Sequence, residues 1–98
     1  MNGEIILGGE KRGIRCDMNV LEAIQQKFGE VDAIMRERSI SSAKFIVAEM
    51  LNEHNYSVSD PKRYTPDEVG MLMTPEEYVG AWTGCVKLFA DSVTSKKK

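Results

Sequence analysis

The chain has 98 residues, of which 42% are hydrophobic and 29% are charged, with a formal net charge of −2 at pH 7. This length suffices for a single domain, predicted over residues 1–98, and the composition is that of a globular rather than a disordered protein. The weakly acidic balance excludes the broad basic face that nucleic acids and anionic membranes attract. No apolar run approaches the roughly 20 residues that span a bilayer, and a signal-peptide pattern is absent, so a cytoplasmic location is expected.

The N-terminal segment predicts a β-hairpin over residues 4–16. Two short apolar runs flank the glycines at 8–9, which can supply the positive φ angles of a tight turn. The first run contains three consecutive apolar residues, Ile5, Ile6 and Leu7. A strand with two apolar faces is either sandwiched in the core or exposed at an interface, and these residues leave both alternatives open. Since a two-stranded hairpin is barely stable alone, it is expected to lie on helices or to extend another sheet.

A capped helix is predicted directly after the hairpin. Asp17 is a suitable N-cap, and Gly29 is placed to end the helix in the left-handed conformation. The apolar residues between them recur at helical spacing: Leu21, Ile24 and Phe28. Residues 30–38 are expected to continue as a short helix with these residues inward: Val31, Ile34 and Met35.

A second long helix is expected to begin within residues 39–42 and to end near residues 52–55. Its apolar stripe is Ala43, Ile46, Val47, Met50 and Leu51. The polar segment 56–64 contains Pro61 and is predicted to be a loop and the most mobile part of the chain.

The strongest local pattern is a repeated capping sequence, Thr-Pro-Asp-Glu at 65–68 and Thr-Pro-Glu-Glu at 74–77. In each copy Thr caps the helix, Pro takes the first helical position, and Glu can reach back to the N–H of the cap. The pattern predicts helices at about 66–72 and 75–93. The predicted inner side of the longer helix is Tyr78, Trp82, Cys85, Val86, Phe89 and Val93.

These elements together predict an α+β, mainly α, fold with an N-terminal β-hairpin packed on a small bundle of four to five helices. The helical part is predicted over residues 17–94. Residues 95–98 are a serine followed by three lysines and are predicted to be a disordered basic tail.

The chain contains no recognisable catalytic, metal-binding or cofactor-binding pattern. His54 is the only histidine, and the nearest hydroxyl and carboxyl groups do not follow it at a known catalytic spacing. A solvated histidine near a helix end, favourable to the helix dipole, is the preferred interpretation. The acidic pairs are explained as first-turn residues, and the glycines at 8–9 lack a phosphate-loop motif. We therefore expect a protein that is not an enzyme and that holds no metal or cofactor.

Two cysteines and two methionines allow alternative interpretations. Cys16 and Cys85 match no metal or redox spacing, so two buried reduced thiols are favoured over a disulfide or a metal site. Met71 and Met73 flank the joint between the two capped helices, where flexible thioethers either fill gaps in the core or form an adaptable partner surface. The candidate partner-binding residues are therefore Ile5, Ile6, Leu7, Met71 and Met73.

The hairpin and the helix after it resemble the opening of tail assembly chaperones from long-tailed phages and gene transfer agents. In that family a short strand, a Gly-Gly or Gly-Lys turn and a second strand run directly into a helix, as residues 3–34 do here. The stretch TPDEVGMLMTPEEYVGAWTGCVKLF is similar to the family's short helix followed by a final amphipathic helix. Cys16 stands where the family has a larger apolar residue, and Gly13 is expected to weaken the second strand. The loop at 56–64 is not matched.

The resemblance implies a non-enzymatic role in the host cytoplasm. Such chaperones bind the long, largely helical tape measure protein, keep it from aggregating until tail tube subunits polymerise around it, and are absent from the mature virion. The implied partner is the tape measure protein, with the tail tube protein as a second candidate and self-association into a homo-oligomer as an addition. No nucleic acid or membrane partner is expected.

Two further points stay open from the sequence. Many members of the family have a frameshifted longer product, and Lys96–Lys98 is compatible with an A-rich slippery codon run as well as with an ordinary solubilising tail. A structural head–tail connector or other small virion component is the alternative function.

Overall fold

The computed structural model describes residues 2–36 and 39–94. These residues form two strands and five helices, in the order β1 (Asn2–Leu7), β2 (Glu10–Arg15), α1 (Met18–Phe28), α2 (Ala33–Arg36), α3 (Ile40–Ser57), α4 (Pro66–Leu72) and α5 (Pro75–Thr94). The predicted α+β, mainly α, fold is therefore confirmed. The predicted basic tail at 95–98 lies outside the described residues.

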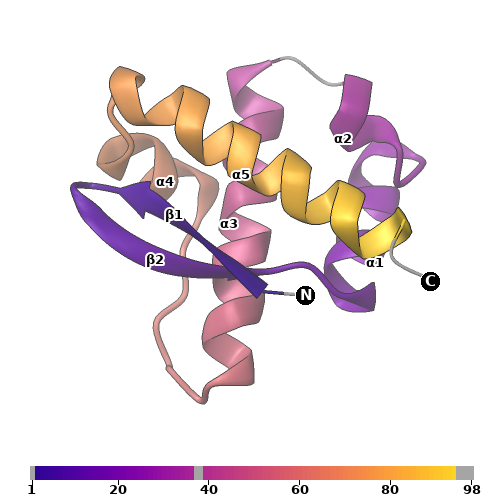
Figure 1. Cartoon of the computed structure of the whole chain (residues 1–98), viewed down its shortest axis with the longest axis horizontal. Helices are drawn as coiled ribbons and strands as arrows, with labels where there is room; N and C mark the ends of the chain where they lie inside the picture. Colours follow the sequence, from indigo (N-terminus) through magenta and orange to yellow (C-terminus); the bar gives the residue numbers. More distant parts are fainter. Residues whose placement is uncertain (1, 37–38, 95–98) are drawn as a thin grey trace.

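Helix α3 is the central element of the fold. It contacts the hairpin through β2 and also contacts α1, α4 and α5. Figure 1 shows α5 and the hairpin crossing α3, with α1 and α2 at one end of the molecule and α4 beside the hairpin turn. The hairpin therefore lies on helices, which is the first of the two arrangements that its small size allows.

The hairpin is antiparallel and has the predicted turn. Residues Leu7 and Glu10 are paired at the turn, and the pairing continues to Asn2 and Arg15. Gly8 and Gly9 have φ angles of 64° and 80°. Two consecutive positive φ angles match the twist of the flanking strands, and glycine adopts them without steric cost.

The two faces of β1 have different environments. Ile5 and Leu7 are buried in the core, whereas Ile6 is 43% exposed. Ile5 and Leu7 therefore belong to the core, as the first of the two alternatives predicts. Of the three predicted partner-binding residues of this strand, only Ile6 has a side chain exposed on the folded chain.

Gly13 allows β2 to approach α3. A Cβ atom at this position would lie 2.4 Å from both Cε1 and Nε2 of His54, far inside van der Waals contact. The His54 ring thus occupies the space that a side chain at residue 13 would need. His54 is only partly exposed, not the solvated residue that was predicted, and its buried Nδ1 has no hydrogen-bond partner among the described residues.

The predicted start and end of α1 are confirmed. The Asp17 carboxylate accepts hydrogen bonds from the backbone N–H groups of Asn19 and Val20, and Gly29 closes the helix with φ 94°. The short helix predicted at 30–38 begins later than predicted, because α2 starts at Ala33 and extends to Arg36, and residues 37–38 lie outside the described residues. Ile34 is buried as predicted, but Met35 is exposed.

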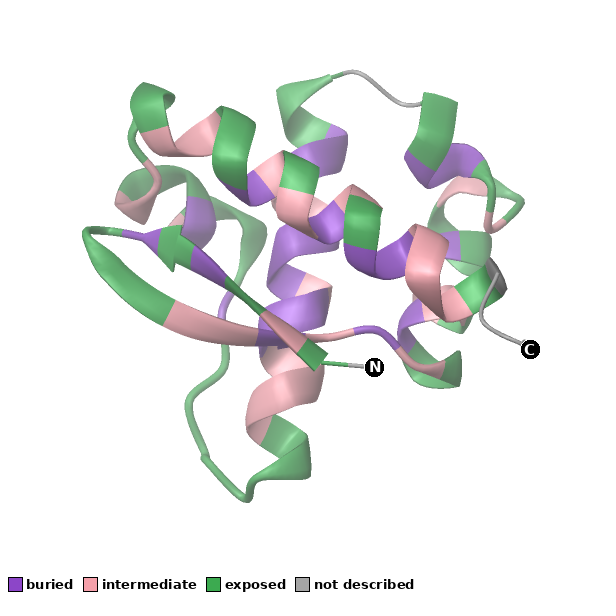
Figure 2. Ribbon diagram, viewed as in Figure 1, coloured by how far each residue is buried: buried purple, intermediate pink, exposed green. Residues whose placement is uncertain are grey.

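The apolar stripe of α3 is confirmed in full. All five predicted residues are buried, and Figure 2 shows the buried part of α3 beneath α5 and the hairpin. The helix begins at Ile40 after the Ser39 cap, within the predicted range, and ends later than predicted, at Ser57.

The inner face of α5 differs from the predicted stripe. The buried residues are Ala81, Cys85, Leu88 and Phe89. Tyr78, Trp82 and Val86 are only partly buried, and Val93 is exposed. Small residues face the hairpin because the helix lies close to it: a Cβ atom at Gly84 would be 3.1 Å from Cγ2 of Ile5. Cys85 and Phe89 are buried as predicted, whereas close approach to the hairpin at Gly84 leaves room only for a small residue there.

The loop between α3 and α4 is hydrogen-bonded to α3. The Asn52 side chain accepts from the N–H of Tyr64 at 2.6 Å and donates to its carbonyl oxygen at 2.9 Å. Asn55 donates to the carbonyl oxygen of Lys62 at 3.1 Å. The predicted loop begins too early, because α3 continues to Ser57, and it ends at the start of α4 at Pro66. Its mobility stays a prediction, and these bonds act against motion near residues 62–64.

Both cysteine thiols lie in the core, which predicts low reactivity. Burial raises the pKa of Cys85 to about 12 and also raises the pKa of Cys16. Since the thiolate is the reactive form, we expect neither thiol to react with a thiol-specific chromophore in the native protein at pH 8. Both should react within minutes in denaturant. Rapid labelling of the native protein would contradict the burial of these residues.

Candidate protein-binding site

Two capping boxes start α4 and α5, and the second of them lies at the joint between these helices. Thr65 and Glu68 exchange hydrogen bonds of 3.0 and 3.1 Å between side chain and backbone, and Thr74 and Glu77 do the same at 3.1 and 3.2 Å. The repeated pattern therefore starts both helices as predicted. The joint consists of Met73 and Thr74, which connect the two helices.

Glu77 also fixes the hairpin turn to this joint. Its carboxylate accepts hydrogen bonds from the N–H groups of Gly8 at 2.9 Å and Gly9 at 2.8 Å. The backbone N–H of Thr74, followed by those of Gly8 and Gly9, lowers the pKa of Glu77. No local spacing predicts this contact, because the hairpin turn and the start of α5 are far apart in the sequence.

We expect Glu77→Gln to loosen the turn, since a neutral amide is a weaker acceptor for three backbone donors. Amide hydrogen exchange at Gly8 and Gly9 should become faster, while Glu76→Gln, the matched control on the neighbouring exposed residue, should leave it unchanged. Because the pKa of Glu77 is lowered by folding, the wild-type protection should fall as the pH drops below the usual range of glutamate and the carboxylate is protonated. Equal protection of the Gly8 and Gly9 amides in the two variants would contradict the role of Glu77 in holding the turn.

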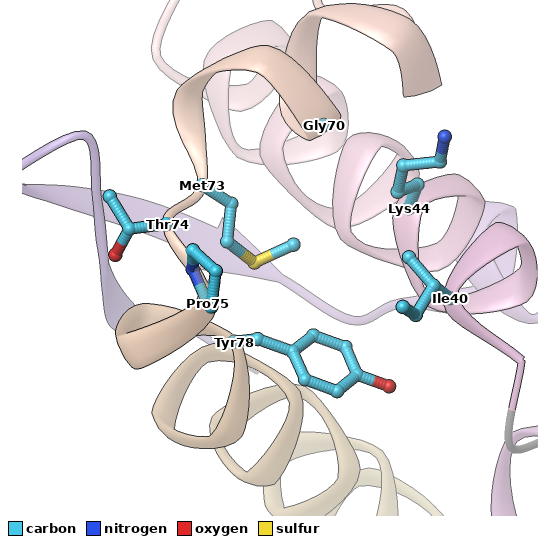
Figure 3. Close-up of a pocket in the computed structure, with 7 residues that line it drawn as sticks. All are labelled: Ile40, Lys44, Gly70, Met73, Thr74, Pro75 and Tyr78. Atoms are coloured by element: carbon cyan, nitrogen blue, oxygen red, sulfur yellow. The ribbon is translucent and has the colours of Figure 1, made fainter.

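An apolar hollow lies between the joint and the first two turns of α3. It has a volume of about 210 Å³ and is lined from α3 by Ile40 and Lys44, from α4 by Gly70, and from the joint and α5 by Met73, Thr74, Pro75 and Tyr78. Figure 3 shows Met73 and Tyr78 projecting from the joint toward Ile40 and Lys44. An apolar cavity of about 150 Å³ accommodates a benzene-sized group. The hollow can therefore take one large apolar side chain.

The predicted surface residues occupy different places around this site. Met73 lines the hollow and is partly buried, so it both fills space in the core and contributes to a surface. Met71, on α4, is 86% exposed but does not line the hollow. Ile6 lines a separate groove between β1 and α5, together with Glu76 and Gly80. The structure thus brings Met73 together with Ile40 and Tyr78, which the sequence did not single out as a surface.

Two of the side chains that line the hollow, Lys44 and Tyr78, end in polar groups. The stem of Lys44 lies against Gly70, where a Cβ atom would be 2.9 Å from Cδ of Lys44. Within residues 2–36 and 39–94, the Lys44 ammonium forms no ion pair and the Tyr78 hydroxyl forms no hydrogen bond. Gly70 and Lys44 would have been difficult to recognise, because they lie on different helices and belong to no motif.

A second cluster of charged groups links the end of the hairpin to α3. Arg15 donates to Asp17 at 2.9 Å, and Asn19 donates to Glu53 at 3.0 Å. A hydrogen bond with Asp17 raises the pKa of Glu53. Burial acts to raise the pKa of Asp17, but hydrogen bonds with Glu53, Arg15 and the backbone lower it overall. The cluster joins α1 to α3 and, in the described part of the chain, no group of three or more metal-ligating side chains is found.

We expect Glu53→Gln to stabilise the protein by about 0.5 kcal/mol at pH 7, where ionised Glu53 faces the Asp17 carboxylate. A raised pKa in the folded state means that protonated Glu53 contributes stability below its unfolded pKa of about 4.3, and that this contribution is lost as the pH rises through the folded pKa. The gain from the substitution should therefore disappear near pH 4. Urea unfolding at both pH values measures it, with Glu22→Gln on exposed α1 as the control. A gain in stability of equal size at both pH values would contradict the hydrogen bond between protonated Glu53 and Asp17.

Among the described residues, no helix combines the length and the apolar character needed to cross a membrane. No family model, curated protein or solved structure matches this chain.

Proposed function

We propose that this protein is a phage tail assembly chaperone that binds the tape measure protein in the host cytoplasm and keeps it soluble until the tail tube forms. The observation that carries the proposal is the apolar hollow at the α4–α5 joint, with exposed apolar residues at or near it. Ile40 at its rim is 62% exposed, and Met71 lies next in sequence to Gly70 in its lining. Exposed apolar surface of this kind is a usual property of protein-binding sites.

The chemistry of the site is suited to a partner that varies in sequence. Met73 has a flexible and polarisable side chain, which can adapt to different apolar groups. The hairpin turn, through Glu77, holds the joint in place beside the hollow. The site therefore combines a joint that is hydrogen-bonded to the hairpin turn with an adaptable methionine side chain in its lining. These features support reversible binding of apolar stripes on a long helical protein, as the sequence resemblance implies.

Co-expression with the tape measure protein encoded immediately downstream tests this function. We expect the chain to raise the soluble fraction of that protein and to co-purify with it. Expression of the tape measure protein alone is the baseline, and co-expression with an unrelated small protein is the control. If the two proteins neither co-purify nor change each other's solubility, the proposal is wrong.

Mass spectrometry of purified particles separates this function from that of a head–tail connector. A chaperone should be present in infected cells and absent from finished particles. Detection of the chain in stoichiometric amounts in particles would contradict the chaperone function and favour a structural role.

A further inference from the structure

The hollow between α3 and the α4–α5 joint has the properties of a socket for a single side chain. Its volume of about 210 Å³ exceeds the roughly 150 Å³ that holds a benzene-sized group. Ile40, Met73 and Tyr78 supply the apolar walls, and Figure 3 shows these three side chains facing a common space. The socket therefore favours a leucine, methionine or phenylalanine over a small or charged residue.

The positive charge of Lys44 at the rim favours a particular kind of residue beside the inserted side chain. Lys44 lines the hollow, and its ammonium has no carboxylate partner within the described residues. Tyr78 lines the same hollow, and its hydroxyl is likewise without a hydrogen-bond partner among the described residues. Both groups can donate a hydrogen bond, and Lys44 carries a positive charge. An acidic side chain is the complement of this rim.

The backbone around the hollow favours a helix as the occupant. Its lining comes from three helices and the joint between two of them, and neither described strand contributes to it. An added strand would find no strand edge to pair with, whereas a helix satisfies its own backbone hydrogen bonds and binds through side chains alone. On a helix, residues three or four apart lie on the same face. One helix can thus present an apolar and an acidic side chain together.

We propose that the hollow binds an amphipathic helix of the partner protein, which inserts one large apolar side chain between Ile40, Met73 and Tyr78 and pairs an acidic side chain one turn away with Lys44. The identity of the partner rests on the proposed function, whereas the chemistry of the helix rests on the hollow. The contact is specific because the apolar anchor and the ion pair must fit at the same time.

Two substitutions test the socket without disturbing the core. Ile40→Asp removes the apolar rim and places a carboxylate four residues before Lys44, where it can pair with that lysine. An acidic residue in the first turn of a helix is favourable for folding, so the variant should remain folded. Lys44→Glu reverses the charge of the rim. Lys11→Glu is the matched control, since Lys11 is exposed on the hairpin and does not line the hollow.

Binding is measured by fluorescence anisotropy with overlapping peptides of about 25 residues that cover the downstream tape measure protein. We expect wild type and Lys11→Glu to bind the same peptides, and Ile40→Asp and Lys44→Glu to bind them at least about tenfold more weakly. Changing the acidic residue of a bound peptide to lysine should restore binding to Lys44→Glu. Circular dichroism confirms that each variant is folded.

The possible failures are distinguishable. If wild type binds peptides and both hollow variants bind them equally well, the socket is wrong and the chaperone function stands. If wild type binds no peptide and also fails the co-expression test, both proposals are wrong. If wild type raises solubility in co-expression but binds no peptide, the function stands and the single-helix socket is wrong.

Discussion

Gly13→Ala should destabilise the protein by about 2 kcal/mol, although alanine is usually no worse than glycine in a strand. The new methyl group would meet the His54 ring at 2.4 Å, so either β2 or the ring must move. Overpacking of this kind costs about 1–3 kcal/mol. Urea unfolding of the variant and of wild type at pH 7 measures the difference, with the expectation that the midpoint falls and the slope does not change.

Gly3→Ala is the matched control for this substitution. Gly3 lies in β1, where a Cβ atom would make only ordinary contacts, the nearest at 3.7 Å from Ile14. This variant should be neutral or slightly more stable, because alanine reduces the entropy of the unfolded chain. In a His54→Ala background the cost of Gly13→Ala should largely vanish, since the two sites then no longer clash. An equal cost in both backgrounds would contradict the contact between Gly13 and His54.

Leu7→Ala should cost about 2–5 kcal/mol, which is a large part of the 5–15 kcal/mol that stabilises a typical domain. Leu7 is fully buried, so the substitution leaves a cavity that its neighbours fill only in part. Thermal unfolding followed by circular dichroism should show a large decrease in Tm. The physical reason is the loss of buried apolar contacts rather than of a binding surface.

Ile6→Ala is the control for the preceding variant, because it truncates the adjacent residue of the same strand. Ile6 is partly exposed, and its truncation should cost less than about 1 kcal/mol. Similar losses of stability in the two variants would contradict the assignment of the two faces of β1. Together the variants decide which part of this apolar strand belongs to the core.

Much of the fold follows from local patterns in the sequence. The positions of Asp17 and Gly29 and the two Thr-Pro sequences determine where α1, α4 and α5 begin or where they end, because caps act through residues three or four apart. The stripe of α3 was also predictable, since one wide apolar face recurs at helical spacing. Such features depend only on near neighbours in the chain.

The features that could not be predicted depend on contacts between residues far apart in the sequence. The sequence gives no sign that the His54 ring, on α3, occupies the space that a side chain at Gly13 would need. The inner face of α5 was predicted only in part: Cys85 and Phe89 are buried as predicted, but close packing on the hairpin places Ala81 and Gly84 there as well. Helical periodicity gives the width of an apolar face, but the neighbouring element decides which residues it covers.

The candidate site was predictable only in part. The methionines at the joint were recognisable because they lie between two capping boxes, and Met73 does line the hollow. Ile40, Lys44 and Tyr78 were not recognisable as one surface, because they come from the start of α3 and from α5. Nothing in their spacing along the chain indicates that these elements meet.

The most direct test of the proposed chaperone function is to dilute purified tape measure protein from denaturant and follow its aggregation by light scattering. Equimolar wild-type chain and the Lys11→Glu variant should suppress the scattering, and Ile40→Asp should suppress it far less. Undiminished scattering in the presence of the wild-type chain, at concentrations where it is folded, would contradict the account.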